Sequence, residues 1–230
     1  MKNKNGKSPA LRLFAAALVL LLFGSIGGAL AALAYRLEGE KGYTAEIAML
    51  SADVRILEQG RAASALSFGE SDGSLIPGKQ YDEELSVGNS GEIDEYVRVV
   101  IRRCWKDGGE KDASLDPGKI ALHLLTEGSG WVEDTTARTP ERTVLYYTRP
   151  LAAGAATSAF CDTLTLDAAV QTLVKQEGTS MTTTTFLYDG KTLCLEIEAD
   201  GVQTHHAADA ILSAWGRRVS IDESGTLSLG

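Results

Sequence analysis

Residues 81–105 read YDEELSVGNSGEIDEYVRVVIRRCW and contain two consecutive strand patterns joined by a turn. In the second pattern Val97 and Val99 alternate with polar residues, as in a strand with one buried face. The first pattern alternates in the same way. Asn89 and Gly91 between them tolerate the left-handed backbone angles that a tight turn needs. The sequence therefore predicts a β-hairpin here.

Composition predicts a folded, acidic protein. The chain has 230 residues and is 44% hydrophobic, which is enough for a substantial core. The first 34 residues carry four basic side chains and no acidic ones. Residues 35–230 therefore hold 18 Lys and Arg against 31 Asp and Glu, a net charge of −13. Such a chain repels nucleic acid and anionic lipid headgroups, so neither is an expected partner.

The first 34 residues have the pattern of a secretory signal. A basic start precedes an uncharged apolar run from Leu13 to Ala34, and the small residues Ala32 and Ala34 have the spacing of a signal-peptidase site. The alternative is an uncleaved hydrophobic helix that anchors the chain, because the run is about as long as the ~20 residues that span a bilayer. Both interpretations place the rest of the chain outside the cytoplasm.

Residues 35–49 are predicted to be a flexible lead, and residues 50–230 a β domain. Residues 50–57 favour a strand, although a helix also fits their apolar spacing. Residues 59–78 are predicted to be a long loop with a short strand near 65–68, and Asp189-Gly190 a hairpin turn between strands at 182–188 and 193–199. Further short strands are expected at 120–125, 131–132, 142–148, 160–166 and 219–221.

Two short helices are predicted. Asp167 is placed to cap the first, with Val170, Leu173 and Val174 on one side, and Thr204 to cap the second, which ends at Gly216. Eight to ten short strands with frequent turns predict an all-β fold, an antiparallel jelly-roll or Greek-key β-sandwich. The margins of such sheets carry unpaired backbone groups that can template another strand.

Cys104, Cys161 and Cys194 cannot all pair within one chain. Their strand parity places them opposite the best apolar stripes, so we interpret them as incidental small residues at partly exposed positions. One disulfide across neighbouring strands is the alternative, and the sequence leaves its pairing open.

No catalytic, cofactor or metal site is predicted. The adjacent His205 and His206 would point about 100° apart on a helix, and His123 lies in an apolar strand. A calcium loop fits the spacing of the acidic residues between 107 and 116 poorly. Nucleophile-elbow and phosphate-loop motifs are missing from the sequence. The chain is therefore expected not to be an enzyme.

Tyr96, Arg98 and Arg102 share the polar side of the second strand and form a possible partner face. Their guanidinium groups suit a carboxylate or an acidic patch. The alternative is that they pair with acidic residues across the ladder, with Glu84 on the preceding strand as the obvious candidate.

Short motifs spread over residues 20–221 resemble the TasA and camelysin group of secreted proteins. They are Ala-Leu-Ala-Tyr at 32–35, Pro77-Gly78-Lys79, Val87 to Gly91, Tyr96 to Val99, Trp131-Val132, Tyr146 to Thr148, and Val202-Gln203 through Ala214-Trp215-Gly216.

The resemblance implies a jelly-roll protein of a Gram-positive bacterium, exported with a SipW-type signal peptidase to the cell surface or biofilm matrix. Partners would be the protein itself or related subunits, joined in fibres when the N-terminal strand of one completes the sheet of the next. On this chain the donor would be residues 35–58, although Arg36-Leu37-Glu38 departs from the family pattern. Camelysin-like members are described as metallopeptidases, an activity for which this sequence has no zinc motif. A secreted metallopeptidase and a monomeric surface binding module remain the alternatives.

Overall fold

The computed structural model describes residues 33–37, 44–51, 54–63, 75–171, 173–178 and 181–230. The chain divides into two compact units, Met1–Leu30 and Ala31–Gly230, and only the second contains described residues. The expected signal segment with Ala32, and the short strand expected near 65–68, lie outside them.

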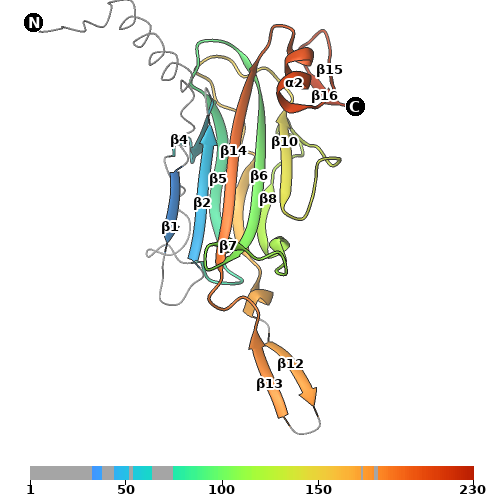
Figure 1. Cartoon of the computed structure of the whole chain (residues 1–230). Coiled ribbons are helices and arrows are strands. Elements are labelled where there is room, and N and C mark those ends of the chain that lie inside the picture. The colour runs from blue at the N-terminus through green and yellow to red at the C-terminus, as the bar shows by residue number, and fades with distance from the viewer. Residues whose placement is uncertain (1–32, 38–43, 52–53, 64–74, 172, 179–180) are drawn as a thin grey trace, which may run out of the picture. The chain divides into compact units, whose positions relative to one another are not determined.

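One sheet has seven strands, and its long central members β14 and β6 run side by side (Figure 1). Its pairings are antiparallel except that β2 runs parallel to β14. The order across the sheet is β1 (Leu33–Leu37), β2 (Thr44–Ser51), β14 (Thr192–Gln203), β6 (Glu95–Asp107), β10 (Arg142–Tyr147) and β9 (Trp131–Glu133), with β7 (Glu110–Lys111) beside the end of β6.

The second sheet is fully antiparallel and lies behind the first in Figure 1. Its order is β4 (Arg61–Ala62), β3 (Val54–Glu58), β5 (Gln80–Asn89), β11 (Cys161–Leu166) and β8 (Ile120–Leu124). The main core combines buried side chains of both sheets, such as Leu85 and Leu164 from the second with Val99 and Ile197 from the first. The fold is therefore an all-β sandwich, as the strand patterns predict.

A second apolar cluster covers one end of the outer face of the seven-stranded sheet. Ile211 of α2 (Ala207–Trp215) packs with Tyr96 and Tyr146 of the sheet, and Leu227 joins them from the two-stranded sheet of β15 (Val219–Ile221) and β16 (Leu227–Leu229). The C-terminal elements thus bury an area that strand parity alone assigns to solvent.

The expected hairpin at residues 81–105 is wrong in its pairing, although both strands exist. β5 pairs with β3 and β11, whereas β6 pairs with β14 and β10 in the other sheet. The connection is an arch across the sandwich. Asn89 holds it, because its amide nitrogen donates to the carbonyls of Ile93 at 2.7 Å and Leu151 at 3.0 Å. Alternation shows only that each strand buries one face, and an arch meets that condition as well as a hairpin does.

The first predicted helix is wrong beyond its opening turn. Asp167 does accept a hydrogen bond from the Ala169 amide at 2.7 Å, but only a 3₁₀ turn follows, η2 (Ala168–Gln171). The chain then forms a two-stranded hairpin, β12 (Leu173–Gly178) with β13 (Met181–Phe186). β13 therefore does not pair with β14 across Asp189-Gly190 as expected. Residues 182–185 are four consecutive threonines, and such a β-branched run favours a strand, which needs another strand as its partner and so draws residues 173–178 out of the expected helix.

The second helix is confirmed, with a different start. His206 in the left-handed region is its N-cap, without a capping side-chain bond, so Thr204 is not the cap. Gly216, at φ 68°, ends it as predicted. Another 3₁₀ turn, η1 (Pro117–Lys119), lies in the polar segment after β6.

At the N-terminus the structure has strands where a flexible lead was expected. β1 and β2 occupy much of residues 33–51, and β3 begins at Val54. The described residues of the segment 50–57 are in strands, as the sequence favours, but Leu50 and Ser51 belong to one sheet and Val54 to Leu57 to the other. Ala34, one of the expected cleavage residues, lies in β1 opposite Ala48.

Candidate functional site

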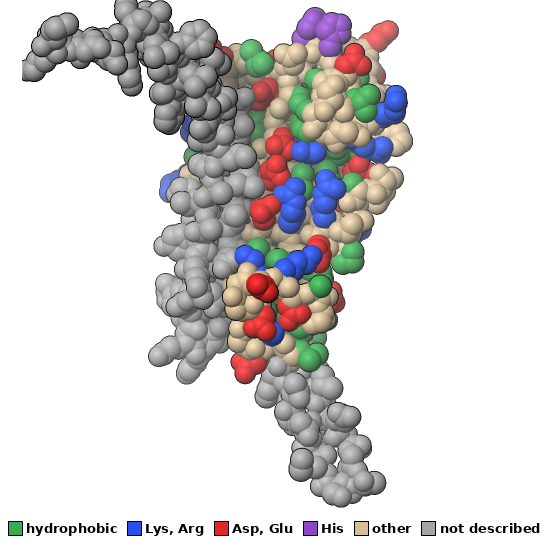
Figure 2. Space-filling model, in the orientation of Figure 1, with side chains coloured by type: hydrophobic (Ala, Val, Ile, Leu, Met, Phe, Trp, Pro, Cys, Tyr) green, Lys and Arg blue, Asp and Glu red, His purple; other side chains and the backbone are tan. Residues whose placement is uncertain are grey.

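The outer face of the seven-stranded sheet carries the densest group of charged and sulfur side chains. Figure 2 shows Lys and Arg side chains interleaved with Asp and Glu across this face. On β6 and β14 the register places Arg98 opposite Asp200, Arg102 opposite Glu196, and Cys104 opposite Cys194. Directly paired residues share a face of the sheet, so the three pairs form one column.

The two arginines of the predicted partner face have acidic neighbours on β14. Arg98 Nε donates to Asp200 Oδ2 at 3.0 Å, and its guanidinium lies 5.0 Å from the Trp215 ring centre. Arg102 Nη1 contacts Glu196 at 2.6 Å and Glu198 at 2.7 Å. Pairing across the ladder is therefore confirmed, but the partners lie on β14. Glu84 belongs to β5 in the other sheet.

Tyr96 does not share the exposure of these arginines. Its side chain is 2% exposed and lies in the cluster under α2 and β16. Its hydroxyl donates to the Gly225 carbonyl at 2.7 Å. Arg102, with 44% of its side chain exposed, is the accessible member of the predicted face, whereas Arg98 is 14% exposed.

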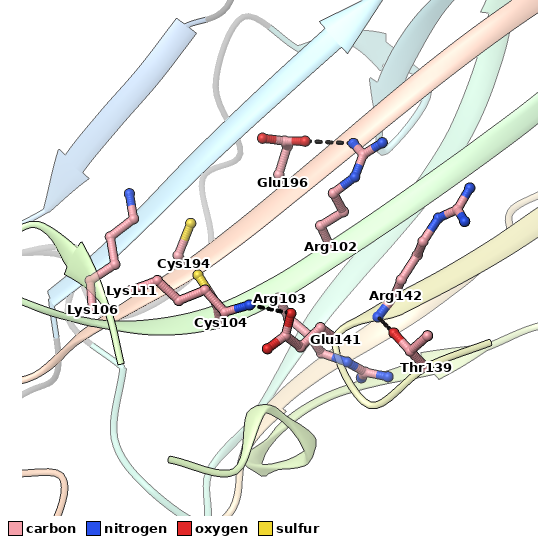
Figure 3. Close-up of a pocket in the computed structure, with 10 residues that line it drawn as sticks. All are labelled: Arg102, Arg103, Cys104, Lys106, Lys111, Thr139, Glu141, Arg142, Cys194 and Glu196. Carbon is pink, nitrogen blue, oxygen red and sulfur yellow. Dashed lines mark hydrogen bonds and ion pairs between the residues drawn. The ribbon is translucent and has the colours of Figure 1, made fainter. Parts of the chain in front are cut away.

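Beyond Arg102 the same column opens into a cavity of about 480 Å³ around the two cysteines (Figure 3). Neither cysteine is in a disulfide, both are half-buried, and their side chains lie side by side in the view. Five basic side chains and two acidic ones line the cavity, together with Thr139 and the cysteines. The basic residues are Arg102, Arg103, Lys106, Lys111 and Arg142, and the acidic ones are Glu141 and Glu196.

The environment of Cys104 favours its thiolate. The pKa of Cys104 is lowered to about 7, chiefly by a hydrogen bond with Cys194 and also by Lys106 and Lys111, against the opposing effect of burial. Glu141 acts in the other direction but is itself paired with Lys111 at 2.5 Å. The thiolate is the nucleophilic form of cysteine. The lowered pKa of Cys104 therefore makes its sulfur more reactive than that of an ordinary cysteine.

Cys161 differs from the sequence-based expectation. It is 0% exposed within the main core, and burial raises its pKa to about 12. The pairing of β11 shifts register between Cys161 and Thr163. Such an irregularity interrupts the alternation of inward-facing and outward-facing side chains. Strand parity counted back from Leu164 therefore places Cys161 on the wrong side.

Sequence patterns did not predict that Cys104 and Cys194 lie opposite each other on neighbouring strands. Both alternate with apolar residues in long strands, which does place each on an outer face. Their distance along the chain leaves the register unknown until β14 is aligned with β6. Burial of Glu83 was also missed, although it shares parity with the buried Tyr81 and Leu85.

The acidic segment after β6 binds a lysine. Lys191 Nζ lies 2.6 Å from Asp107 and 3.1 Å from Asp112, so an ammonium group occupies the position of a cation between these carboxylates. Asp116 accepts instead from the Gly118 amide in η1. Glu110 lies in the short strand β7.

The histidines do not converge on one site. His205 and His206 are exposed neighbours with ring centres 4.2 Å apart. His123 is exposed on β8, with its Nδ1 2.7 Å from Asp162. In the described part of the chain no three His, Cys, Asp or Glu side chains come together as metal ligands. Across the same residues no helix is long and apolar enough to cross a membrane.

The other notable feature is the sheet margin formed by the N-terminal strands. β2 lies against β14 over eight residue pairs, from Thr44 opposite Thr192 to Ser51 opposite Ala199, and β1 lies outside β2. Glu46 is the partner of Cys194 on this side. Comparison of the chain with family models, with curated proteins and with solved structures found no match.

Proposed function

We propose that this protein is an exported structural subunit of a bacterial cell surface or biofilm matrix, with a jelly-roll sandwich that assembles by strand complementation. Its partners are further copies or related subunits, and a SipW-type signal peptidase processes it. The donor lies within residues 35–58 and comprises the part of this segment up to Ser51, the end of β2. One observation carries the proposal: β1 and β2 form one margin of the seven-stranded sheet, and β2 joins that sheet by pairing in parallel with β14.

Every other pairing between described strands is antiparallel, which makes β2 an addition to an otherwise antiparallel sheet. Without β1 and β2, the long strand β14 would become the sheet margin. Its unpaired backbone groups would then template an incoming strand. The same segment of a neighbouring chain restores every contact that the chain's own segment makes, so exchange costs little at equilibrium.

The strand to be lent and the strand to be kept lie in different sheets. β2 ends at Ser51 in one sheet, and β3 starts at Val54 in the other. A chain that keeps β3 in its own sandwich and lends β2 to the next subunit forms a heterologous, head-to-tail contact. Such contacts repeat into filaments when the rotation between subunits does not close a ring.

Deletion of the donor tests the proposal. Residues 35–230 at high concentration should form thread-like assemblies in electron micrographs, and residues 52–230 should not. A matched control replaces the β12–β13 hairpin with a short Gly-Ser linker and should still form threads, since these strands pair only with each other. A mature protein that stays monomeric at high concentration contradicts the proposal.

A cysteine introduced by Glu46→Cys reports which chain donates β2. Combined with Cys104→Ser, it leaves Cys194 as its register partner on β14. After assembly and oxidation, exchange should give a ladder of disulfide-linked multimers on a non-reducing gel. Linked monomers alone, in threads seen by microscopy, would show that assembly uses a different surface.

A further inference from the structure

Cys104 and Cys194 meet the geometric requirement for a disulfide. They are direct partners in the antiparallel register of β6 and β14, where Cα atoms are about 4.5–5.5 Å apart. Disulfides span Cα separations of about 4.4–6.8 Å, so the bond can form without moving either strand. Figure 3 shows both sulfur atoms on the same side of the two strands.

Access distinguishes this pair from the third cysteine. The cavity of about 480 Å³ opens directly onto both sulfur atoms. Cys161, by contrast, lies wholly inside the sandwich. A dissolved reactant can therefore reach the pair while the protein remains folded.

The charge around the pair favours an anionic reactant. Five cations and two carboxylates line the cavity, and the ion pairs of Arg102 with Glu196 and of Lys111 with Glu141 satisfy both carboxylates. On the β2 side Glu46 is the register partner of Cys194. Arg103 and Arg142 add further positive charge to the lining, and this excess of cations attracts carboxylate-bearing molecules to the sulfurs.

We propose that Cys104 and Cys194 are a redox-active dithiol that exchanges with carboxylate-bearing disulfides in the cavity lined by residues of β6, β7, β10 and β14. The thiolate of Cys104 attacks one sulfur of the disulfide, forming a mixed disulfide and releasing one thiolate. Cys194 then attacks Cys104, forms the intramolecular bond and releases the second thiolate. In the net reaction two protein thiols lose two electrons and two protons, and one disulfide becomes two thiols.

The order of attack follows from the environment. Cys104 has the pKa of about 7, and Lys106 and Lys111 favour its anion. An ordinary cysteine, with a pKa of about 8.5, is only a few per cent thiolate at pH 7. Cys104 is therefore the attacking group, and Cys194 resolves the mixed disulfide.

The test uses the full chain, purified reduced in mild detergent, and glutathione disulfide as the probe. Mass spectrometry should show loss of two hydrogen atoms and a peptide link between Cys104 and Cys194. Cys194→Ser should stop at the mixed disulfide, with one glutathionyl group on Cys104. Cys161→Ser is the matched control and should react like the unaltered chain. A link to Cys161, or no glutathionyl group on Cys104, would overturn the proposal.

Two further measurements exclude mere exposure as the cause. Alkylation of Cys104 in the Cys194→Ala, Cys161→Ser chain should have a higher apparent pKa than alkylation of Cys104 in the Cys161→Ser chain, because alanine donates no hydrogen bond to the thiolate. Lys106→Gln with Lys111→Gln should slow the reaction with glutathione disulfide about tenfold. The same double substitution should slow the reaction with 2-hydroxyethyl disulfide, a neutral probe, much less. Equal effects on both probes would contradict the selection for anionic disulfides.

Discussion

Gly201 of β14 gives space to the carboxylate of Glu95 at the start of β6. A Cβ atom at position 201 would lie 2.9 Å from the carboxyl carbon of Glu95, which is closer than real side chains approach each other. Glu95 is 5% exposed, so its side chain cannot simply swing into water. The glycine in the middle of this long strand is therefore explained by packing.

We expect Gly201→Ala to lower the free energy of unfolding by about 1–3 kcal/mol, the usual cost of overpacking a buried site. Urea denaturation followed by tryptophan fluorescence measures it. In a Glu95→Ala background the same substitution should cost much less, since the obstructing carboxylate is gone. An unchanged cost in that background would show that Glu95 is not the obstacle.

Removal of the Ile211 side chain tests the attachment of the C-terminal elements. Ile211 is 0% exposed between α2 and the outer face of the sheet. Ile211→Ala should therefore destabilise the protein by about 2–5 kcal/mol, measured by denaturant unfolding. Leu187→Ala is the control, because Leu187 is 50% exposed and should change stability little. Equal effects would contradict a packed cluster at this end of the sheet.

Local sequence patterns located the strands better than they assigned partners. Alternation in residues 81–87 and 95–105 correctly gives two strands whose odd-numbered residues are buried, apart from the half-buried Arg103. Alternation does not show whether two consecutive strands pair with each other in one sheet or lie in opposite sheets across the core. The arch between β5 and β6 was therefore mistaken for a hairpin. The same limit applies at Asp189-Gly190, where the turn exists but joins strands of different sheets.

The site was harder to predict, because it depends on register between distant segments. Parity places Cys104 and Cys194 on outer faces, but only the alignment of β14 with β6 brings them together. Tyr96 was assigned to solvent because the sequence gives no sign that α2 and β16 return to cover it. At Cys161 the shift in the pairing of β11 turns the side chain to the face opposite the one that alternation predicts.

The arch between the sheets should depend on the side-chain amide of Asn89. This residue is 3% exposed, donates to two carbonyls, and accepts from the Gly91 amide at 2.8 Å. Asn89→Ala should cost about 1–3 kcal/mol, because it removes all three of these hydrogen bonds at a buried position, although the Leu151 carbonyl keeps the Glu95 amide as a donor. Asn89→Asp keeps the acceptor but faces both carbonyls with a carboxylate, so it should be at least as harmful at pH 7.

Chemical denaturation at pH 7 measures both variants, with Glu92→Gln in the same turn as the exposed control. Part of the Asn89→Asp loss should be recovered at pH 4, where the new carboxyl group gains a proton that it can donate. Wild-type stability in Asn89→Ala would show that the arch does not depend on this side chain.

Glu83 should make the stability of the protein fall as pH rises. It is 2% exposed in β5, and burial, a hydrogen bond with Glu58 and the charge of Glu58 raise its pKa to about 9 from 4.5. Between pH 4.5 and 9 the folded protein keeps this proton while the unfolded chain loses it. The free energy of unfolding therefore loses up to about 1.4 kcal/mol per pH unit across that window.

Glu83→Gln replaces the protonated carboxyl group with a neutral amide of similar shape and should remove this slope. Thermal unfolding at pH 5 and pH 8 measures the effect: we expect the variant to resemble the wild type at pH 5 and to be more stable at pH 8. Glu84→Gln is the matched control, since this neighbouring side chain is exposed. If Glu83→Gln retains the wild-type difference between the two pH values, Glu83 is ionised in the folded protein and its carboxylate has a partner that stabilises the charge.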